Sequence, residues 1–312
     1  MSNRTSTKIW ALRFAVLVVI LAAAVSLWSG RAPGTLRVWF ADVGQGDGIV
    51  IRTPSQETIV VDGGPRQDFV KEVDSHVPVT DRAVDLLVAT HADADHITGL
   101  VGLVESGRVV NALINRDATK QTKVYQHLLA ALAKQEVNVI EAQAGQEYTF
   151  GEVRVRVLWP SVAGLAAAKE SNEKSIVLRV SYGSQDLLLT GDAPDTVEKQ
   201  LLQQGSALDA EVLKVGHHGS KYSSIAVFLQ AVSPDIAIVS VGAKNRYGHP
   251  ASRVLADLEK LPLVERTASI DELAARYFTA NSRPKESSSL PQRRVQSRHL
   301  EGRHTHRVVP VP

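Results

Sequence analysis

The chain has 312 residues, of which 44% are hydrophobic, enough to bury the core of one large α/β domain or of two small ones. The formal net charge is only +2, so the overall charge does not mark a nucleic-acid-binding protein. There is no cysteine, which excludes disulfides and cysteine-ligated zinc, so a metal ion would have to be held by histidine and carboxylate side chains.

The N-terminus combines basic residues with an uncharged apolar run. Arg4, Lys8 and Arg13 precede the segment Phe14–Trp28. This order is typical of a signal peptide or a signal anchor, although the run is shorter than the ~20 residues of a full membrane span. We therefore expect residues 1–30 to be a signal peptide or membrane anchor, with a buried core helix as the alternative. The charge asymmetry predicts that the rest of the chain lies outside the cytoplasm.

After a short linker at residues 31–34, apolar and polar residues alternate as in strands. Strands are predicted over 36–40, 48–52, 58–61, 83–89, 153–159, 175–181, 186–189, 212–215 and 236–241. Helices are predicted over 95–105, 125–135, 196–203 and 252–261. The strands form two blocks that each end in helices, which indicates an α/β protein with two sheets faced by helices.

The C-terminal region has a different composition from the rest of the chain. A short helix is predicted over 271–278, and the chain beyond Asn281 is rich in Ser, Arg and Pro. We expect a folded domain over residues 35–266 and a poorly structured basic tail over 267–312, in which His304 and His306 are solvated. No strand is recognisable in the sequence after Val264.

Four metal-capable side chains occur within six residues at the end of the predicted strand 83–89. They are His91, Asp93, Asp95 and His96. A lone histidine or aspartate is usually structural, but carboxylates this close together repel one another, and a bound cation removes that repulsion. The segment therefore predicts a metal site.

Three further motifs follow predicted strands. Gly191-Asp192 ends one strand, Gly216-His217-His218 ends the next, and His249 lies in the loop after the strand that ends at Val241. Each motif alone is compatible with an ordinary turn. Together with the first motif they indicate a single site rich in histidine and aspartate.

These motifs resemble those of the metallo-β-lactamase superfamily. The segments Asp42–Asp47, Val61–Gly64, Asn172–Ser175 and Arg246–Pro250 narrow the resemblance to the hydrolase domain of ComEC-family DNA-uptake proteins and their stand-alone relatives. The similarity covers roughly Leu36 to Leu261. It implies a four-layer αβ/βα sandwich.

The resemblance also implies two divalent metal ions. His91 and Asp93 would hold the first, Asp95, His96 and His217 the second, and Asp192 would bridge them. Many relatives carry histidine at position 93 and a further mid-chain histidine. Here the mid-chain candidate His127 lies in a predicted amphipathic helix, and Asn172–Ser175 takes that place. The first site is thus richer in oxygen, which leaves zinc and manganese both open.

Two close cations would lower the pKa of a shared water molecule and neutralise charge on a phosphoryl or acyl oxygen. We assign catalysis to Asp95, Asp192 and His249, with His249 as proton donor to a leaving group. The residues expected to support ligands or loops from behind are Asp42, Asp47, Asp62, Asn172, Ser175 and His218.

Lys214, Lys221, Lys244 and Arg246 flank the third and fourth motifs, and cations beside a two-metal centre favour a phosphodiester. Ordinary surface charge is the alternative. No aromatic series interleaves them, so the sequence does not indicate a stacking platform for single strands.

The leading function is therefore a metal-dependent phosphodiesterase or nuclease acting outside the cytoplasm, with a nucleic-acid substrate and a membrane contact through the N-terminal helix. The alternatives are a phosphocholine esterase, a lactonase, a β-lactamase-like enzyme or a non-catalytic envelope binding protein. The many membrane spans of an uptake channel are missing, so this chain cannot itself be the pore.

Overall fold

The computed structural model describes residues 35–78, 80–114, 122–243, 245–261 and 278–279. The chain divides into a unit that ends at Thr35 and a second unit from Leu36 onward. The predicted signal or anchor segment and most of the predicted basic tail lie outside the described residues. Within the described part of the chain, no helix has the length and hydropathy needed to cross a membrane.

The first sheet has seven strands in the order β13-β1-β2-β3-β4-β5-β6. The first three strands in the chain pair antiparallel, and β3 to β6 pair parallel. The strands are β1 (Thr35–Phe40), β2 (Gly48–Arg52), β3 (Thr58–Gly63), β4 (Leu86–Ala89), β5 (Asn111–Ile114), β6 (Asn138–Glu141) and β13 (Phe278–Thr279).

The second sheet has six strands in the order β12-β11-β10-β9-β8-β7. Its strands β7 to β10 are antiparallel, and β10, β11 and β12 are parallel. The strands are β7 (Glu147–Phe150), β8 (Val153–Trp159), β9 (Val177–Tyr182), β10 (Gln185–Leu189), β11 (Val212–Lys214) and β12 (Ile236–Ile238).

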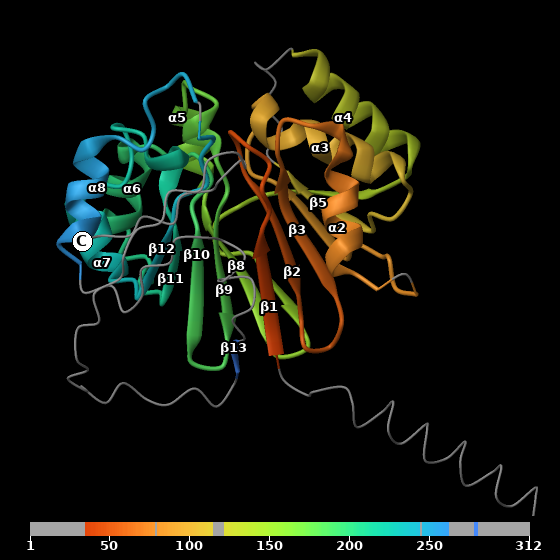
Figure 1. Cartoon of the computed structure of the whole chain (residues 1–312), viewed down its shortest axis with the longest axis horizontal. Helices are drawn as coiled ribbons and strands as arrows, with labels where there is room; N and C mark the ends of the chain where they lie inside the picture. The colour runs from red at the N-terminus through yellow and green to blue at the C-terminus, as the bar shows by residue number, and fades with distance from the viewer. Residues whose placement is uncertain (1–34, 79, 115–121, 244, 262–277, 280–312) are drawn as a thin grey trace, which may run out of the picture. The chain divides into compact units, whose positions relative to one another are not determined.

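Helices cover the outer face of each sheet (Figure 1). The first sheet carries α2 (Val70–His76), α3 (Ala94–Glu105) and α4 (Lys123–Lys134), and the second carries α6 (Asp195–Gln203), α7 (Ala226–Val232) and α8 (Ser252–Glu259). One hydrophobic core lies between the two sheets, and a further core lies between each sheet and its helices. The described residues from Leu36 onward therefore form the helix–sheet–sheet–helix layers that the sequence predicts.

Helix α3 approaches β3 unusually closely, because both elements place glycine at the contact. The backbone N–H of Gly99 donates to the carbonyl of Gly64 at 3.1 Å. A Cβ atom added at Gly99 would lie 2.0 Å from the carbonyl oxygen of Gly63. This close packing fixes the start of α3, which carries Asp95 and His96.

Some predicted elements differ from the observed ones. The strand predicted over 83–89 begins only at Leu86, and Val84 makes an isolated bridge to Val109. Phe278 begins strand β13 and is not the end of a helix, while residues 271–277 of that predicted helix lie outside the described residues. Strand β13, which the sequence did not indicate, lies at the edge of the first sheet beside β1.

Several short elements were not predicted. They are β5, β6, β7, α2, α7, the helix α5 (Val162–Ala167) and the 3-10 turns η1 (Gln67–Phe69), η2 (Asn172–Lys174) and η3 (Gly216–Gly219).

Candidate metal centre

The candidate site lies where parallel strands of both sheets end, as is common in sheets of this kind. The loop from β4 to α3 supplies His91 and Asp93, and Asp95 and His96 lie in the first turn of α3. The turn after β10 supplies Asp192. The remaining side chains come from η3, which follows β11, and from the loop between β1 and β2: His217, His218 and Asp47.

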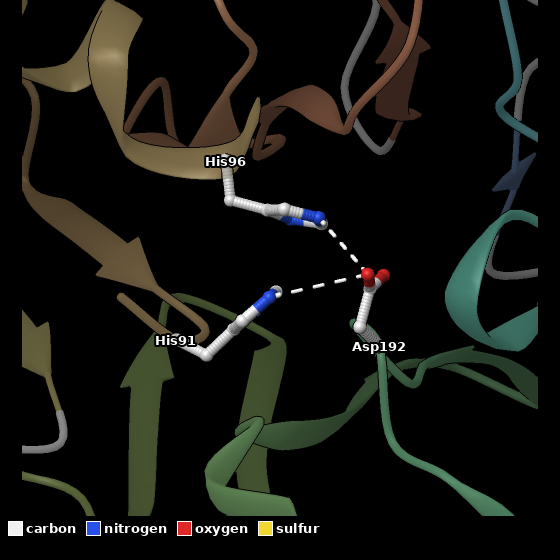
Figure 2. A group of neighbouring side chains, drawn as sticks. All are labelled: His91, His96 and Asp192. Atoms are coloured by element: carbon white, nitrogen blue, oxygen red, sulfur yellow. Dashed lines mark ion pairs between the residues drawn. The ribbon is translucent and has the colours of Figure 1, made fainter. Parts of the chain in front are cut away.

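Asp192 is the common neighbour of the imidazoles. Its Oδ2 lies 3.4 Å from Nε2 of both His96 and His218, 3.7 Å from Nε2 of His217 and 3.9 Å from Nε2 of His91. Figure 2 shows His91 and His96 turned toward this carboxylate. Four imidazoles therefore face one buried oxygen.

A partner on Nδ1 fixes three of these rings. Asp62 Oδ2 lies 2.8 Å from Nδ1 of His96, and the carbonyl oxygen of Ser240 lies 2.8 Å from Nδ1 of His218. Nδ1 of His91 lies 3.0 Å from Oγ1 of Thr90, which donates its own proton to Asp62. Contacts of this kind set the ring orientation of metal-binding histidines, and here they turn each Nε2 toward Asp192.

The convergent atoms lack other partners. Among the described residues, Nε2 of His91, His96 and His218 and Oδ1 of Asp192 are buried without a hydrogen bond. Buried polar atoms without partners are costly and rare. The gaps of 3.4–3.9 Å are too long for good hydrogen bonds, but they are close to the ~3.4 Å that separates ligands around a tetrahedral ion with bonds of about 2.1 Å.

Two of the compact ligand groups match a two-ion centre. One is His91, His96 and Asp192, and the other is Asp95, His96 and His218. The two groups share His96, and Asp192 Oδ2 lies 3.4 Å from His218 of the second group. The His/Asp clusters are consistent with a di-metal site.

The electrostatics of the cluster also favour a bound cation. Burial lowers the pKa of His96, but attraction to Asp192 and Asp62 outweighs burial and raises this pKa well above its usual value. In the same way the pKa of His218 rises to about 9. Burial alone would raise the pKa of Asp192, yet the charges of His218 and His96 hold it well below its usual value. The carboxylates thus attract positive charge into the buried centre.

The two adjacent histidines of η3 lie in different surroundings. His218 is buried, with Nε2 at 3.7 Å from Oδ2 of Asp95, whereas the His217 side chain is 25% exposed and belongs to none of the compact ligand groups. Both residues have left-handed backbone conformations, with φ of 48° and 55°. This tight turn directs the two rings differently, and the sequence alone does not show which one faces Asp95.

Lys214 lies behind the centre and does not flank its mouth. Its side chain is 1% exposed, and its ammonium pairs with Asp47, donates to the carbonyl of Gly191 at 3.1 Å and lies 3.9 Å from Oδ1 of Asp192. A substrate cannot reach it from solvent. Lys221 and Arg246 are exposed, and Lys244 lies outside the described residues.

The other predicted site residues occupy the surroundings. Oγ of Ser175 accepts from the backbone N–H of Asp192 at 3.2 Å, and the amide of Asn172 lies 3.3 Å from the His217 ring. The His249 ring lies 5.6 Å from the ring of His217. Asp42 is exposed and accepts from the N–H of Gly44 at 3.3 Å.

Asp93 and His127 complete the predicted set. The Asp93 side chain is partly exposed, with Oδ2 at 3.9 Å from Nε2 of His91. His127 is exposed on α4, and its ring contacts Glu105 at 2.9 Å, so it occupies a surface position.

Two groups that position the imidazoles were missed in the sequence. One is the backbone carbonyl of Ser240, and no sequence signal identifies a carbonyl group. The other is the hydroxyl of Thr90, whose place directly before His91 was the available signal.

Residues 41–243, more than half of the chain, match the family model of the metallo-beta-lactamase superfamily. The chain belongs to this superfamily, and the buried His/Asp cluster makes it a metal-dependent hydrolase. It is a distant homologue of bacterial competence proteins. It is 30% identical over 254 residues to ComE operon protein 3 of Bacillus subtilis and 32% identical over 241 residues to competence protein ComA of Neisseria gonorrhoeae.

Both matches cover 76% of this chain, which spans about a third (32%) of the length of each relative. Among solved structures, the metallo-beta-lactamase fold protein YhfI of Bacillus subtilis is 15% identical, with a TM-score of 0.41. That match covers 58% of this chain and 70% of YhfI.

Proposed function

We propose that this protein is a two-metal phosphodiesterase that cleaves nucleic acid outside the cytoplasm. The observation that carries the proposal is the convergence of three oriented imidazoles on Asp192, with Asp95 beside them. Exposed Lys221 and Arg246 in the neighbouring loops are suited to phosphate. The similarity to competence protein ComA, together with the motif resemblance to DNA-uptake proteins, supports a nucleic-acid substrate.

The proposed ligands follow from the two compact groups. His91, with Asp93 nearby, would hold one ion, and Asp95 and His218 would hold the other. His96, which is in both groups, would bind one of the two through Nε2, and Asp192 would supply a carboxylate oxygen. When bound, two divalent ions activate a water molecule as nucleophile and neutralise charge that builds on the phosphoryl oxygens. Carboxylates supply many of the ligands, so manganese and zinc are both candidates.

The protein's own side chains supply the rest of the proposed reaction. Asp62, Thr90 and the carbonyl of Ser240 keep the imidazoles in place. His249 lies near the more exposed side of the site, next to His217, where it can donate a proton to the leaving oxygen.

The location outside the cytoplasm is part of the proposal. It is supported by the basic residues that precede the apolar run Phe14–Trp28.

The test is hydrolysis by the full chain of a substrate panel in zinc and in manganese. The panel contains a phosphodiester oligonucleotide, a phosphocholine ester, a lactone and a β-lactam. The proposal predicts metal-dependent turnover of the oligonucleotide above the others, and this turnover should stop when a chelator is added. Turnover of the lactone, the lactam or the phosphocholine ester alone would contradict it.

A further inference from the structure

Two exposed tyrosines lie next to the candidate metal centre. Tyr222 is 63% exposed and Tyr247 is 69% exposed. In the described part of the chain between Thr35 and Leu261, no other tyrosine, tryptophan or phenylalanine is mostly exposed. Exposed aromatic rings that cluster at one site are a sign of binding. The sequence does not indicate this grouping, because the two residues lie in separate loops.

Tyr222 forms part of the wall of a cavity of about 490 Å³ that opens beside the metal centre. Asp93 and His217 also line this cavity. Among the described lining residues there is no further tyrosine and no phenylalanine or tryptophan. The volume lies in the range of ordinary ligand pockets. The ammonium of Lys221 lies over one face of the Tyr222 ring, 4.9 Å from its centre, so that face carries a cation for a phosphate and a base would stack on the other face.

Tyr247 reaches the same centre through a stack of rings. Its ring stacks on His249 with centroids 5.7 Å apart and an angle of 17°, and His249 meets His217 edge-on at 5.6 Å. His249 covers one face of Tyr247, and the high exposure leaves room on the other. The exposed cation Arg246 directly precedes it, as Lys221 precedes Tyr222.

Both loops are held by side-chain hydrogen bonds to their backbone. The Asn245 amide donates to the carbonyls of Gly242 and His249 and accepts from the N–H groups of Tyr247 and His249. On the other loop, Arg253 donates to the carbonyls of Lys221 and Ser224, and Glu198 accepts from the N–H of Ser224. Rings on such loops lose little freedom when a ligand binds.

We propose that Tyr222 and Tyr247 are two base-stacking positions beside the metal centre, so that the protein binds nucleic acid as a single strand with a phosphodiester at the metals. This inference rests on the proposed function and names the form of its substrate. In a duplex both faces of each base are covered by neighbouring bases, whereas an unpaired base can stack on a protein ring. Duplex DNA would therefore bind more weakly than a single strand.

The test measures the affinity of the full, metal-loaded chain for two labelled strands. One is a single-stranded oligonucleotide, and the other has the same length and charge but lacks bases, both with uncleavable phosphorothioate linkages. Base stacking predicts that Tyr222→Ala and Tyr247→Ala each raise the Kd of the base-bearing strand about fivefold or more. The Kd of the abasic strand should change less than twofold.

Matched variants separate stacking from other effects. Tyr222→Phe and Tyr247→Phe keep the ring and should keep the affinity. Val110→Ala, which removes an exposed apolar side chain that does not line the cavity, should leave both Kd values unchanged. Equal binding of the two strands by the unmodified protein, or an equal loss for both strands in the alanine variants, would overturn the inference.

A parallel hydrolysis assay distinguishes this inference from the proposed function. If both tyrosines support strand binding but no phosphodiester is cleaved in zinc or manganese, the proposed function fails and the stacking sites stand. If a phosphodiester without bases is cleaved but strand binding does not depend on the tyrosines, the proposed function stands and the stacking sites fail.

Discussion

Asp192 is the residue on which the proposed centre depends most. Its Oδ2 faces four imidazoles, and its Oδ1 is buried without a hydrogen bond among the described residues. An uncharged amide at this position would present an N–H₂ group or a weaker oxygen to the ions. The binding of two metal ions should therefore depend more on the Asp192 carboxylate than on the partly exposed rings of His217 and His249.

Replacement of Asp192 and of His249 should have different effects. Asp192→Asn is expected to lose bound metal and with it the hydrolytic activity. His249→Ala is expected to keep its metal and lower turnover by about 10²–10⁴-fold, the usual cost of losing a general acid. Metal content and rate should be measured on the same samples, with His127→Ala as the control histidine, because the exposed His127 pairs with Glu105 at the surface.

If His249→Ala loses metal as Asp192→Asn does, then His249 is a ligand and the proposed role as proton donor is wrong. If His249→Ala keeps both its metal and full turnover, the His249 side chain has no part in catalysis and serves only the structure of its loop.

Lys214 is a buried charge that supports the site through its ion pair with Asp47. Lys214→Met leaves the Asp47 carboxylate without its partner, and breaking a buried pair in this way costs about 3–5 kcal/mol of unfolding free energy. Lys199→Met, which breaks the exposed pair with Asp195, should cost less than about 1 kcal/mol. Denaturant unfolding of the two variants under the same conditions checks this. Similar losses for both would contradict the buried pairing.

At the scale of elements, α6 and α7 are joined through one buried carboxylate. Glu198 on α6 accepts from the N–H groups of Ser224 and Ile225 just before α7, at 2.5 and 2.9 Å. Burial raises the pKa of Glu198 to about 7, although these two hydrogen bonds oppose the rise. The folded protein therefore holds a proton on this group at pH values where the unfolded chain has released it.

This raised pKa predicts a pH dependence of stability with a definite sign. A carboxyl whose pKa rises on folding contributes most below its unfolded value of 4.5, and that contribution falls as the pH rises toward about 7. At about 1.4 kcal/mol per unit the loss amounts to roughly 3 kcal/mol. The unfolding free energy of the unmodified protein minus that of Glu198→Gln should therefore be more positive at pH 5 than at pH 8.

Denaturant unfolding of both proteins across this pH range measures that difference, and contributions from all other groups cancel in the comparison. A difference that stays constant, or that grows with pH, would contradict a raised pKa at Glu198.

The elements also show why sequence reasoning succeeded in part. The motif around His91 and Asp95 was recognisable because it follows a continuously apolar strand. The strands β5, β6 and β7 have four residues each, too few for a periodic pattern to stand out. Lys214 was predicted to lie in a cation cluster for a phosphodiester, with ordinary surface charge as the alternative, because one lysine in a strand of three residues does not reveal that both faces of that strand are buried.

The site was predictable in its composition and less so in its geometry. The sequence identified the histidines and aspartates, but the choice between His217 and His218 depends on two consecutive left-handed backbone conformations. The pairing of Tyr222 with Tyr247 depends on two loops that meet only in the folded chain, through His249 and His217.

At the scale of the whole molecule, the proposal that the protein acts outside the cytoplasm makes a prediction about the location of the folded unit. The basic residues before the run Phe14–Trp28 predict that the chain after it lies outside the cytoplasm. A reporter that is active only in the periplasm, fused after Thr35 and expressed in a Gram-negative host, should therefore be active. The matched control carries Asp in place of Leu at positions 17 and 21 and should be inactive. Activity of a cytoplasmic reporter at the same fusion point would reverse the orientation.

The central claim is that the two compact His/Asp groups form one di-metal centre, and the metal content of the full chain tests it most directly. Elemental analysis of the protein, purified at neutral pH without chelator and then saturated with zinc or manganese, should find two ions per chain. The Asp192→Asn variant treated in the same way should retain one ion or none. One ion or none in the unmodified protein would contradict the account.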